Sequence, residues 1–306
     1  MFTAKNWVNL QPMNPILSEH TIIKEKQEWR IKGFIADQPE RFDLSVEFGR
    51  NHFSYAVYDT ITRFLKVVGK IEFEFVEKKD SYALLFSELK SASGDILKAG
   101  YNHAYVTWNT PGATLVPLAF FTDSFKEEYL KFNNGQHENN RILAEEVRGR
   151  EIKVIYSVPE PFKLFLDAQL SNHKLKHIST SLLEIILSST SRNKEKLALI
   201  NINSSDFNLL LLENGLRFFN TFKYNNTEDI LYYTLFAMEQ NGFDAHVDKI
   251  LLAGEIESGS GTHKLLQQYI KHIAFATTDK NIIRDENLSV LPHHYFFNLL
   301  NRLVCE

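Results

Sequence analysis

Two stretches of the chain, whose first predicted strands begin at residues 42 and 197, carry the same predicted order of strands and helices. In each stretch, three strands joined by short turns are followed by alternating helices and strands, in the order β-β-β-α-β-α-β-α. A repeat of about 155 residues is far longer than a solenoid unit and indicates a duplicated domain. Strand meanders followed by helix–strand units favour mixed sheets with helices on their faces. We therefore predict an α/β protein with a lead-in at 1–40 and two lobes at 41–175 and 176–306, joined in a connecting segment around 171–195.

The first half begins with a polar segment and continues into a strand-rich region. Residues 1–40 contain three prolines and show no sustained period, so we expect a lead-in that docks through scattered apolar anchors such as Trp7 and Trp29. The polar residues 133–140 are expected to form a loop. The patterns of the first half predict strands at 42–48, 53–59, 64–76, 103–108 and 151–158, and helices at 80–92, 123–132 and after Pro161.

The second half contains the clearest local signals. Glu213-Asn214-Gly215 is the strongest hairpin signal in the chain, and Asn226 and Asp229 have the spacing of a capping box. The final predicted helix is apolar over a wide part of its surface, and we expect it to pack on the second sheet. The patterns of the second half predict strands at 197–202, 207–212, 216–222, 248–254 and 273–277, and helices from Asn226 to near Gly242, at 263–272 and at 292–304.

Composition excludes several classes of protein. With 306 residues, 44% of them hydrophobic, the chain can bury a sizeable core. Thirty-four basic and 38 acidic residues give a net charge of -4, so we expect no nucleic-acid partner. The single cysteine, Cys305, excludes a disulfide framework and fits a reducing compartment. Neither a signal peptide nor a run of about 18 apolar residues is visible, so we expect a cytoplasmic protein without membrane insertion.

Several short segments resemble actin-like ATPases. The stretch LININSSDFNLLLLENGLRFF resembles the second phosphate hairpin of PilM-like proteins, and DKILLAGE resembles their adenosine strand. The whole chain resembles an uncharacterised bacterial family of unknown function with an actin-like ATPase fold, distantly similar to PilM and FtsA. This resemblance implies a duplicated ribonuclease-H-like fold, with two lobes that each have a mixed five-stranded sheet and flanking helices. Its other marks are FDLSVEFGRNHFSYAV, the TLVP at 114–117, the IYSVPE at 155–160 and HHYFFNLLNRLVC near the end.

The resemblance implies a site for ATP and Mg²⁺ between the lobes. In actin-like ATPases, the first hairpin of each lobe donates backbone N–H groups to the phosphates, and an acidic residue on each hairpin positions Mg²⁺ or water. The first hairpin keeps Gly49 but has Glu47 where the family has Asp. The second hairpin has Asn201 and Asn203 in place of Asp and Gly, and Gly254-Glu255 replaces two glycines. The candidate cofactor-binding residues are Glu47, Gly49, Asn201, Asn203, Ser204, Ser205 and Gly254.

These departures from the family pattern argue against hydrolysis of ATP. Asn201 is neutral and cannot replace a metal-binding carboxylate, and the side chains of Asn203 and Glu255 occupy space that glycine leaves open. We therefore expect no catalytic residues and do not favour ATP or Mg²⁺ as a cofactor. The first hypothesis is a noncatalytic actin-like scaffold or protein-interaction module with a degenerate nucleotide cleft and a protein partner.

The alternative hypothesis is an ATP-binding conformational switch with slow or no hydrolysis. It rests on the retained Gly49 and Gly254 and on the polar set Asn203, Ser204 and Ser205.

Other kinds of site find less support. A small-molecule kinase of the same superfamily needs a catalytic Asp, and Asp206 lies one turn residue away from the usual place. His173 and His177 have the spacing of ligands on one helical face, but no third ligand completes a set, so we expect no metal site. A two-metal nuclease needs converging carboxylates, and the strand at 103–108 has neither Asp nor Glu.

Overall fold

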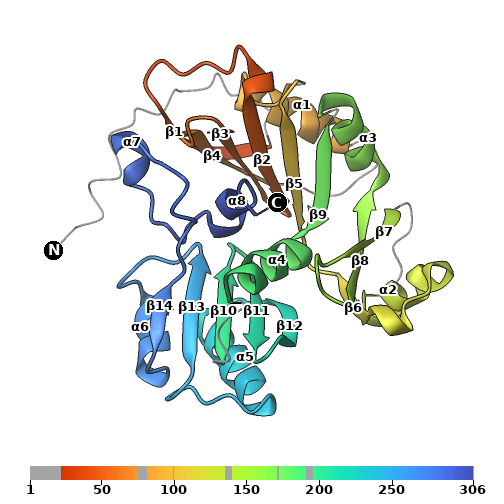
Figure 1. Ribbon diagram of the computed structural model, residues 1–306, viewed down its shortest axis with the longest axis vertical. Coiled ribbons are helices and arrows are strands. Elements are labelled where there is room, and N and C mark those ends of the chain that lie inside the picture. Colours follow the sequence, from red (N-terminus) through yellow and green to blue (C-terminus); the bar gives the residue numbers. More distant parts are fainter. Residues whose placement is uncertain are drawn as a thin grey trace.

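The computed structural model describes residues 22–74, 81–98, 100–134, 140–170, 172–190 and 196–305, whose strands form three sheets (Figure 1). Part of the expected lead-in, including Trp7, and most of the expected loop at 133–140 lie outside the described residues. The predicted α/β class is confirmed, and two large sheets repeat one arrangement of five strands.

The first large sheet has the strand order β1-β4-β3-β2-β5-β9. Strands β2, β3 and β4 are antiparallel neighbours, whereas β5 and β9 continue the sheet in parallel with β2. Strand β1 is a sixth strand that the sequence did not predict, because five of its eight residues are charged. The strands are β1 (Ile23–Arg30), β2 (Phe42–Gly49), β3 (His52–Asp59), β4 (Leu65–Phe73), β5 (His103–Asn109) and β9 (His173–His177).

The second large sheet has the order β12-β11-β10-β13-β14 and repeats the directions of the first. The predicted hairpin between β11 and β12 is present, and Asn214 and Gly215 both adopt the positive φ that such a tight turn requires. The strands are β10 (Leu197–Ile202), β11 (Asp206–Leu212), β12 (Leu216–Lys223), β13 (Lys249–Gly254) and β14 (Ile273–Phe275).

A third, smaller sheet corrects the expected order of the first half. The strand predicted at 151–158 is β8, which lies in this sheet between β6 and β7 and not in the first large sheet. The fifth strand of the large sheet is instead β9, which lies in the segment expected to connect the lobes. The strands of the small sheet are β6 (Thr114–Pro117), β7 (Asn140–Glu146) and β8 (Ile152–Pro159).

Helices cover the two large sheets. Leu89 of α1 and Leu166 of α3 belong to the core cluster of the first sheet, whereas Ile230 of α5 and Leu266 of α6 belong to that of the second. The predicted cap of α5 is present, since the side chain of Asn226 accepts a hydrogen bond of 2.9 Å from the backbone N–H of Asp229. The helices are α1 (Ser81–Ser93), α2 (Lys126–Asn134), α3 (Glu160–Gln169), α4 (Ile178–Thr190), α5 (Thr227–Gln240), α6 (Gly261–Tyr269), α7 (Glu286–Ser289) and α8 (Phe297–Asn301).

The C-terminal segment packs on the first sheet, so the expectation that it packs on the second sheet is wrong. Its helix α8 covers only Phe297–Asn301, less than the predicted 292–304. Leu291, Leu300 and other apolar residues of this segment share a buried cluster with Tyr58 and Val68 of the first sheet. The end of the chain therefore returns from the second sheet to the first, as Figure 1 shows.

Helix α4 joins the cores of the two large sheets. Leu182 and Ile186 of α4 belong to one continuous buried cluster that also contains Val106 of the first sheet and Leu199 and Leu210 of the second. Burial of apolar surface is the main favourable term in folding, so this shared cluster holds the two halves together.

Candidate functional site

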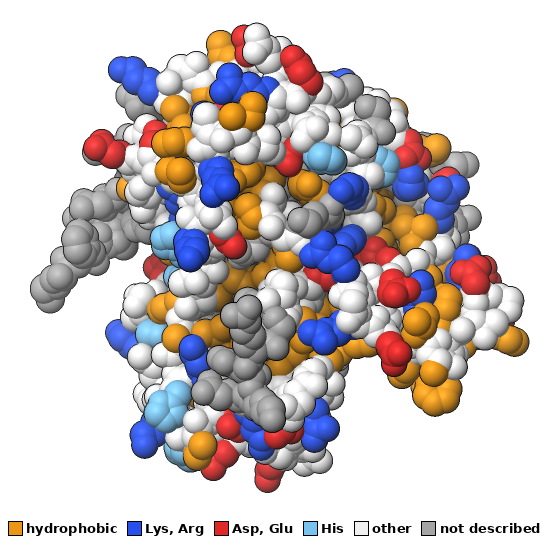
Figure 2. All heavy atoms as spheres, viewed as in Figure 1, with side chains coloured by type: hydrophobic (Ala, Val, Ile, Leu, Met, Phe, Trp, Pro, Cys, Tyr) orange, Lys and Arg blue, Asp and Glu red, His pale blue; other side chains and the backbone are white. Residues whose placement is uncertain are grey.

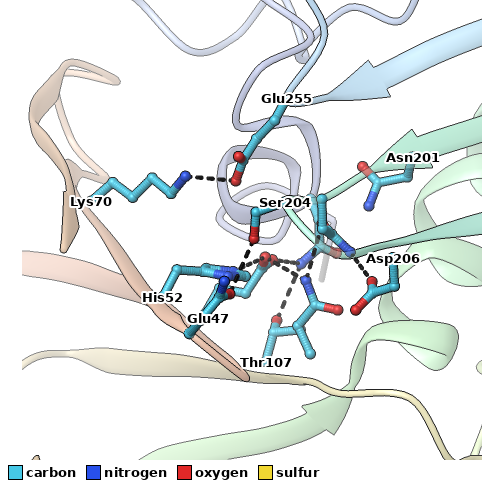
Figure 3. A network of polar contacts seen from close by, with 12 residues as sticks. Glu47, His52, Lys70, Thr107, Asn201, Ser204, Asp206 and Glu255 are labelled. Atoms are coloured by element: carbon cyan, nitrogen blue, oxygen red, sulfur yellow. Dashed lines mark hydrogen bonds and ion pairs between the residues drawn. The ribbon is translucent and has the colours of Figure 1, made fainter. Parts of the chain in front are cut away.

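The hairpin turns of the two large sheets meet, as the resemblance to actin-like ATPases implied. The Ser204 hydroxyl after β10 donates a hydrogen bond of 3.1 Å to the Asn51 side chain in the turn between β2 and β3. Asn109 at the end of β5 donates a hydrogen bond of 3.4 Å to the side chain of Asn203. Figure 3 shows the network of polar contacts at this place, with Glu47 and His52 of the first half near Ser204 and Asp206 of the second.

Glu47 lies at the centre of this network and is buried. Its Oε2 atom accepts a hydrogen bond of 2.6 Å from Asn298, and its Oε1 atom accepts one of 2.9 Å from Asn109. Burial raises the pKa of the Glu47 carboxyl, but neighbouring His52 and the two amides outweigh burial and hold that pKa below its usual value. Glu47 is therefore an ionised, internally hydrogen-bonded carboxylate.

Gly49 leaves space for the ring of His52 in the same hairpin. A Cβ atom at this position would lie 2.0 Å from Cε1 of the His52 ring, so the imidazole occupies the space that a side chain would fill. The Nε2 atom of His52 lies 3.5 Å from Oε1 of Glu47, and its Nδ1 atom is buried without a partner among the described residues. The glycine thus makes room for His52.

Asn201 belongs to a ladder of polar side chains across the second sheet. It donates a hydrogen bond of 3.1 Å to Asn208 of β11, which donates one of 2.9 Å to the hydroxyl of Thr221 in β12. These three residues stand opposite one another in the strand register. The Asn201 amide therefore takes part in hydrogen bonds that connect neighbouring strands of the sheet.

The polar side chains of the second hairpin turn form hydrogen bonds with one another; they belong to Asn203, Ser205 and Asp206. The Asn203 amide donates a hydrogen bond of 2.7 Å to Oδ1 of Asp206, and the Ser205 hydroxyl donates one of 3.4 Å to Oδ2. Burial raises the pKa of Asp206, although the bond from Asn203 opposes this effect. The Asp206 carboxylate is thus held by its own turn.

Gly254 is fixed by the close approach of the β10 backbone. It has φ +82, and a Cβ atom there would lie 2.0 Å from the carbonyl oxygen of Ile202. The next residue, Glu255, donates its backbone N–H to the same oxygen at 2.7 Å, and the N–H of Gly254 bonds to the carbonyl of His294 at 2.8 Å. Backbone packing alone therefore requires this glycine.

Lys70 and Glu255 form an ion pair between the two halves. The Nζ atom of Lys70 in β4 lies 2.7 Å from a carboxylate oxygen of Glu255 and 2.7 Å from one of Glu72. Burial lowers the pKa of Lys70, but the two carboxylates outweigh burial and raise the pKa above its usual value. Glu255, which follows β13, thus binds a lysine of the other half.

The space left among these side chains is small. A cavity of about 30 Å³, which has room for about two or three water molecules, lies between the halves. Its lining includes Glu47, His52, Lys70, Asn201, Tyr295 and Asn298. The contribution of the C-terminal segment was not predicted, because no local pattern in the sequence links Asn298 to Glu47.

A second depression, of about 450 Å³, lies beside the hairpin turns. Ser205, among the candidate residues, lies at its edge, and the other lining residues include Lys24, Arg50, Glu72 and Glu74. Lys24 pairs with Glu74 at 2.8 Å, and both side chains are exposed. The depression has charges of both signs and no buried polar group directed at a ligand among its described residues.

The two histidines considered as metal ligands lie apart on strand β9. His173 and His177 stand at its two ends, about 13 Å from each other at the usual rise per residue. Burial lowers the pKa of His177 to about 4, and its two ring nitrogens contact Thr110 and Ser179 at 2.9 Å. Among the residues that the structure describes, no group of three His, Cys, Asp or Glu side chains is arranged to hold a metal ion. Within the same ranges, no helix is both long and apolar enough to cross a membrane.

Solved structures establish the fold. The chain is similar to a Bacteroides thetaiotaomicron protein with an actin-like ATPase fold and unknown function, at 20% identity and a TM-score of 0.66 over 84% of this chain and 98% of that chain. It is also similar to the PilM–PilN type IV pilus biogenesis complex, at 12% identity and a TM-score of 0.53 over 87% of this chain and 99% of that chain. At these identities the likeness shows the fold alone, and the predicted actin-like ATPase fold is confirmed.

The sequence itself also identifies a family. No curated protein matches it. Residues 31–273 match the family DUF3822, described as a protein of unknown function. The match spans more than half of the chain and includes β2–β5 and β9 of the first large sheet and β10–β13 of the second. The chain therefore belongs to the DUF3822 family of proteins of unknown function.

Proposed function

We propose that this protein is a noncatalytic actin-like scaffold or interaction module whose nucleotide cleft has degenerated. The observation that carries the proposal is that the polar groups of the cleft bond to one another. Lys70 pairs with Glu255, and Glu47 is held by Asn298 and Asn109. A nucleotide with Mg²⁺ would need donors and carboxylates directed at empty space, and about 30 Å³ remains between them.

The retained glycines lend little support to the alternative of an ATP-binding switch. Gly49 makes room for the His52 ring, and Gly254 makes room for the Ile202 carbonyl, so both have reasons to be glycine without a nucleotide. The continuous core through α4 also opposes a switch, because opening the halves would expose the apolar side chains that they share. A rigid body that presents surfaces to partners is the simpler function for such a fold.

The surface of the small sheet supports a role in protein interaction. Phe120, Phe125 and Phe132 are 74%, 54% and 90% exposed, and they flank or belong to helix α2. Figure 2 shows hydrophobic side chains on the projection where Figure 1 places α2. Exposed apolar patches are typical of interaction sites. PilM, which shares the fold, is seen in a complex with PilN, and we extend the idea of a protein partner to this chain only as part of the proposal. We place its action in the cytoplasm, since its single cysteine fits a reducing compartment.

Thermal unfolding with and without millimolar Mg-ATP tests whether the cleft binds a nucleotide. We expect no change in Tm. A ligand at about 100 times its Kd would add about 2.7 kcal/mol to the free energy of unfolding, which for lobes of this size raises Tm by several degrees. Mg²⁺ alone and ATP with a chelator are the controls. A rise in Tm that needs both ATP and Mg²⁺ would overturn the degenerate cleft and favour the switch.

Affinity capture from the native host tests the interaction module. We expect one protein to be recovered in a stoichiometric amount and to remain bound when Mg-ATP is removed. Recovery of the chain alone in repeated captures would contradict a scaffold role.

A further inference from the structure

Strand β12 is the open edge of the second large sheet. It pairs with β11 on one side, and no strand among the described residues pairs with its other side (Figure 1). The backbone N–H of Thr221 points away from β11 and donates a hydrogen bond of 2.9 Å to the Asn220 side chain. Because outward N–H groups alternate along a strand, those of Phe219 and Lys223 also point away from the sheet. The edge therefore presents a row of backbone groups for another strand.

The composition of β12 sets it apart from the other edges of the large sheets. β1 protects its edge with the charged run Lys24–Glu28, whereas β9 has five residues and β14 has three. Such charge and shortness are the usual ways of keeping an edge from pairing. β12 has eight residues, including Phe218, Phe219 and Phe222. Long apolar edges of this kind favour the addition of a strand.

The apolar side chains of β12 lie on both faces of the sheet. Phe222 stacks on Tyr233 of α5, with ring centroids 4.7 Å apart, and Phe218 stacks on Phe222 at 6.3 Å. Phe219 packs on the opposite face with the cluster around α4. All three phenylalanines remain partly exposed. An added strand would bury their free edges against its own alternating side chains.

The charges of β12 distinguish between two possible occupants. Arg217 and Lys223, near its two ends, are both exposed. In a symmetric antiparallel pair centred on Asn220, Arg217 of one copy would stand opposite Lys223 of the other, and like charges in that position are destabilising. An apolar strand with acidic residues at its ends would instead gain at both ends. The charge pattern therefore favours a foreign acidic strand over a second copy of this chain.

We propose that β12 binds an extended segment of a partner protein, apolar and β-branched in its centre and acidic at its ends, which adds a sixth strand to the second sheet. This inference rests on the proposed interaction function and names the surface and the chemistry of the partner. It involves neither the cleft between the halves nor the small sheet.

Fluorescence anisotropy with designed peptides tests the strand addition. The probe has a Val-Thr-Val-Thr-Val centre with two Asp at each end, and the matched control has Lys in place of each Asp. We expect the acidic peptide to bind at least about tenfold more tightly than the basic one at low salt, and to weaken as salt is added. The double variant Arg217→Glu with Lys223→Glu should reverse the preference. It also removes the partly exposed pair of Arg217 with Glu213 at 3.3 Å, which contributes little to stability, so its Tm should fall only slightly.

Two further measurements separate the outcomes. An acidic peptide with alternate N-methylated amides should not bind, because it cannot form hydrogen bonds with the backbone of the edge strand. When the unmodified peptide binds, hydrogen exchange should slow at the backbone N–H groups of Phe219 and Lys223. Equal affinity for the acidic and basic peptides would overturn the proposal. So would a dimer of the unchanged protein in light scattering that is absent in the double variant. If a captured host protein binds the double variant as well as the unchanged chain, the scaffold role stands and the β12 site is wrong.

Discussion

The Nζ atom of Lys70 in β4 lies 2.7 Å from Oε1 of Glu255, which follows β13, so one ion pair connects the two large sheets across the cleft. The Lys70 side chain is 4% exposed and that of Glu255 is 23% exposed. A charge this well buried depends on its partners, because water cannot replace them. The pair therefore holds the cleft in the observed arrangement.

Replacing the lysine should destabilise the protein more than replacing an exposed one. We expect Lys70→Met to lower the free energy of unfolding by about 1.5–3 kcal/mol, since it removes hydrogen bonds to two charged groups. The matched control is Lys24→Met, whose pair with Glu74 has side chains 58% and 67% exposed. Its loss should be clearly smaller, because solvent screens an exposed pair. Urea denaturation measures both, and equal losses would contradict a structural role for the buried pair.

The two glycines with positive φ near the cleft give a second prediction. Gly254 and Gly259 have φ +82 and +79, but a Cβ atom at Gly259 meets nothing within 4 Å. Gly259→Ala should cost about 1–2 kcal/mol from backbone strain alone. Gly254→Ala adds a clash with the Ile202 carbonyl and should cost more than about 4 kcal/mol. Similar losses in urea denaturation would show that Gly254 is not held by backbone packing.

The bond between Asn298 and Glu47 gives a third prediction. Asn298→Asp would place a second carboxylate within hydrogen-bond distance of Glu47 and should lower the free energy of unfolding by about 3–5 kcal/mol at pH 7. Asn298→Ala, which removes the amide without adding charge, should cost less. The double change Glu47→Gln with Asn298→Asp keeps one negative charge and one amide and should recover at least half of the loss. A double-mutant cycle in urea measures the coupling, and a purely additive cycle would contradict it.

The parts of the fold that the sequence predicted are those with local signals. The alternation of Phe42–Gly49, the Asn214-Gly215 turn and the Asn226 cap all depend on near neighbours, and all three are present. Strands β1 and β9 are charged and pair with distant strands, so no local pattern marked them.

The candidate site was predicted in part for the same reason. The structure brings Glu47, Asn203 and Gly254, which the sequence motifs had marked, around one cavity with Lys70 and Asn298. Ser204 bonds across the halves to Asn51. Asn298 lies 251 residues from Glu47 in sequence, and its role depends on the return of the C-terminal segment to the first sheet. The reasons for Gly49 and Gly254 were also beyond sequence reasoning, because the His52 ring and the Ile202 carbonyl come close only in the folded chain.

A partly buried carboxyl outside the cleft gives a pH-dependent prediction. Glu145 of β7 accepts hydrogen bonds from the backbone N–H of His177 at 2.7 Å and from the Tyr156 hydroxyl at 3.1 Å, and so links the small sheet to the first large sheet. Burial raises its pKa from 4.5 to about 7, although these bonds oppose the rise. The folded protein therefore binds more protons at Glu145 than the unfolded chain between pH 4.5 and about 7. It follows that the contribution of Glu145 to stability is greatest below pH 4.5 and falls as the pH rises through this window.

Glu145→Gln removes this titration and leaves a side chain that can still bond to both neighbours. The quantity to follow is the free energy of unfolding of the unchanged protein minus that of the variant. We expect this difference to fall by about 1–3 kcal/mol between pH 5 and pH 8. Burial lowers the pKa of His177, so the contribution of this residue to stability rises with pH. His177 is present in both proteins, and its contribution cancels in the difference. The control is Glu146→Gln, which makes the same change of side chain at an exposed neighbour on the same strand. Urea denaturation at each pH measures both differences, and a Glu145→Gln difference that does not change with pH would show that this carboxyl titrates alike in the folded and unfolded chains.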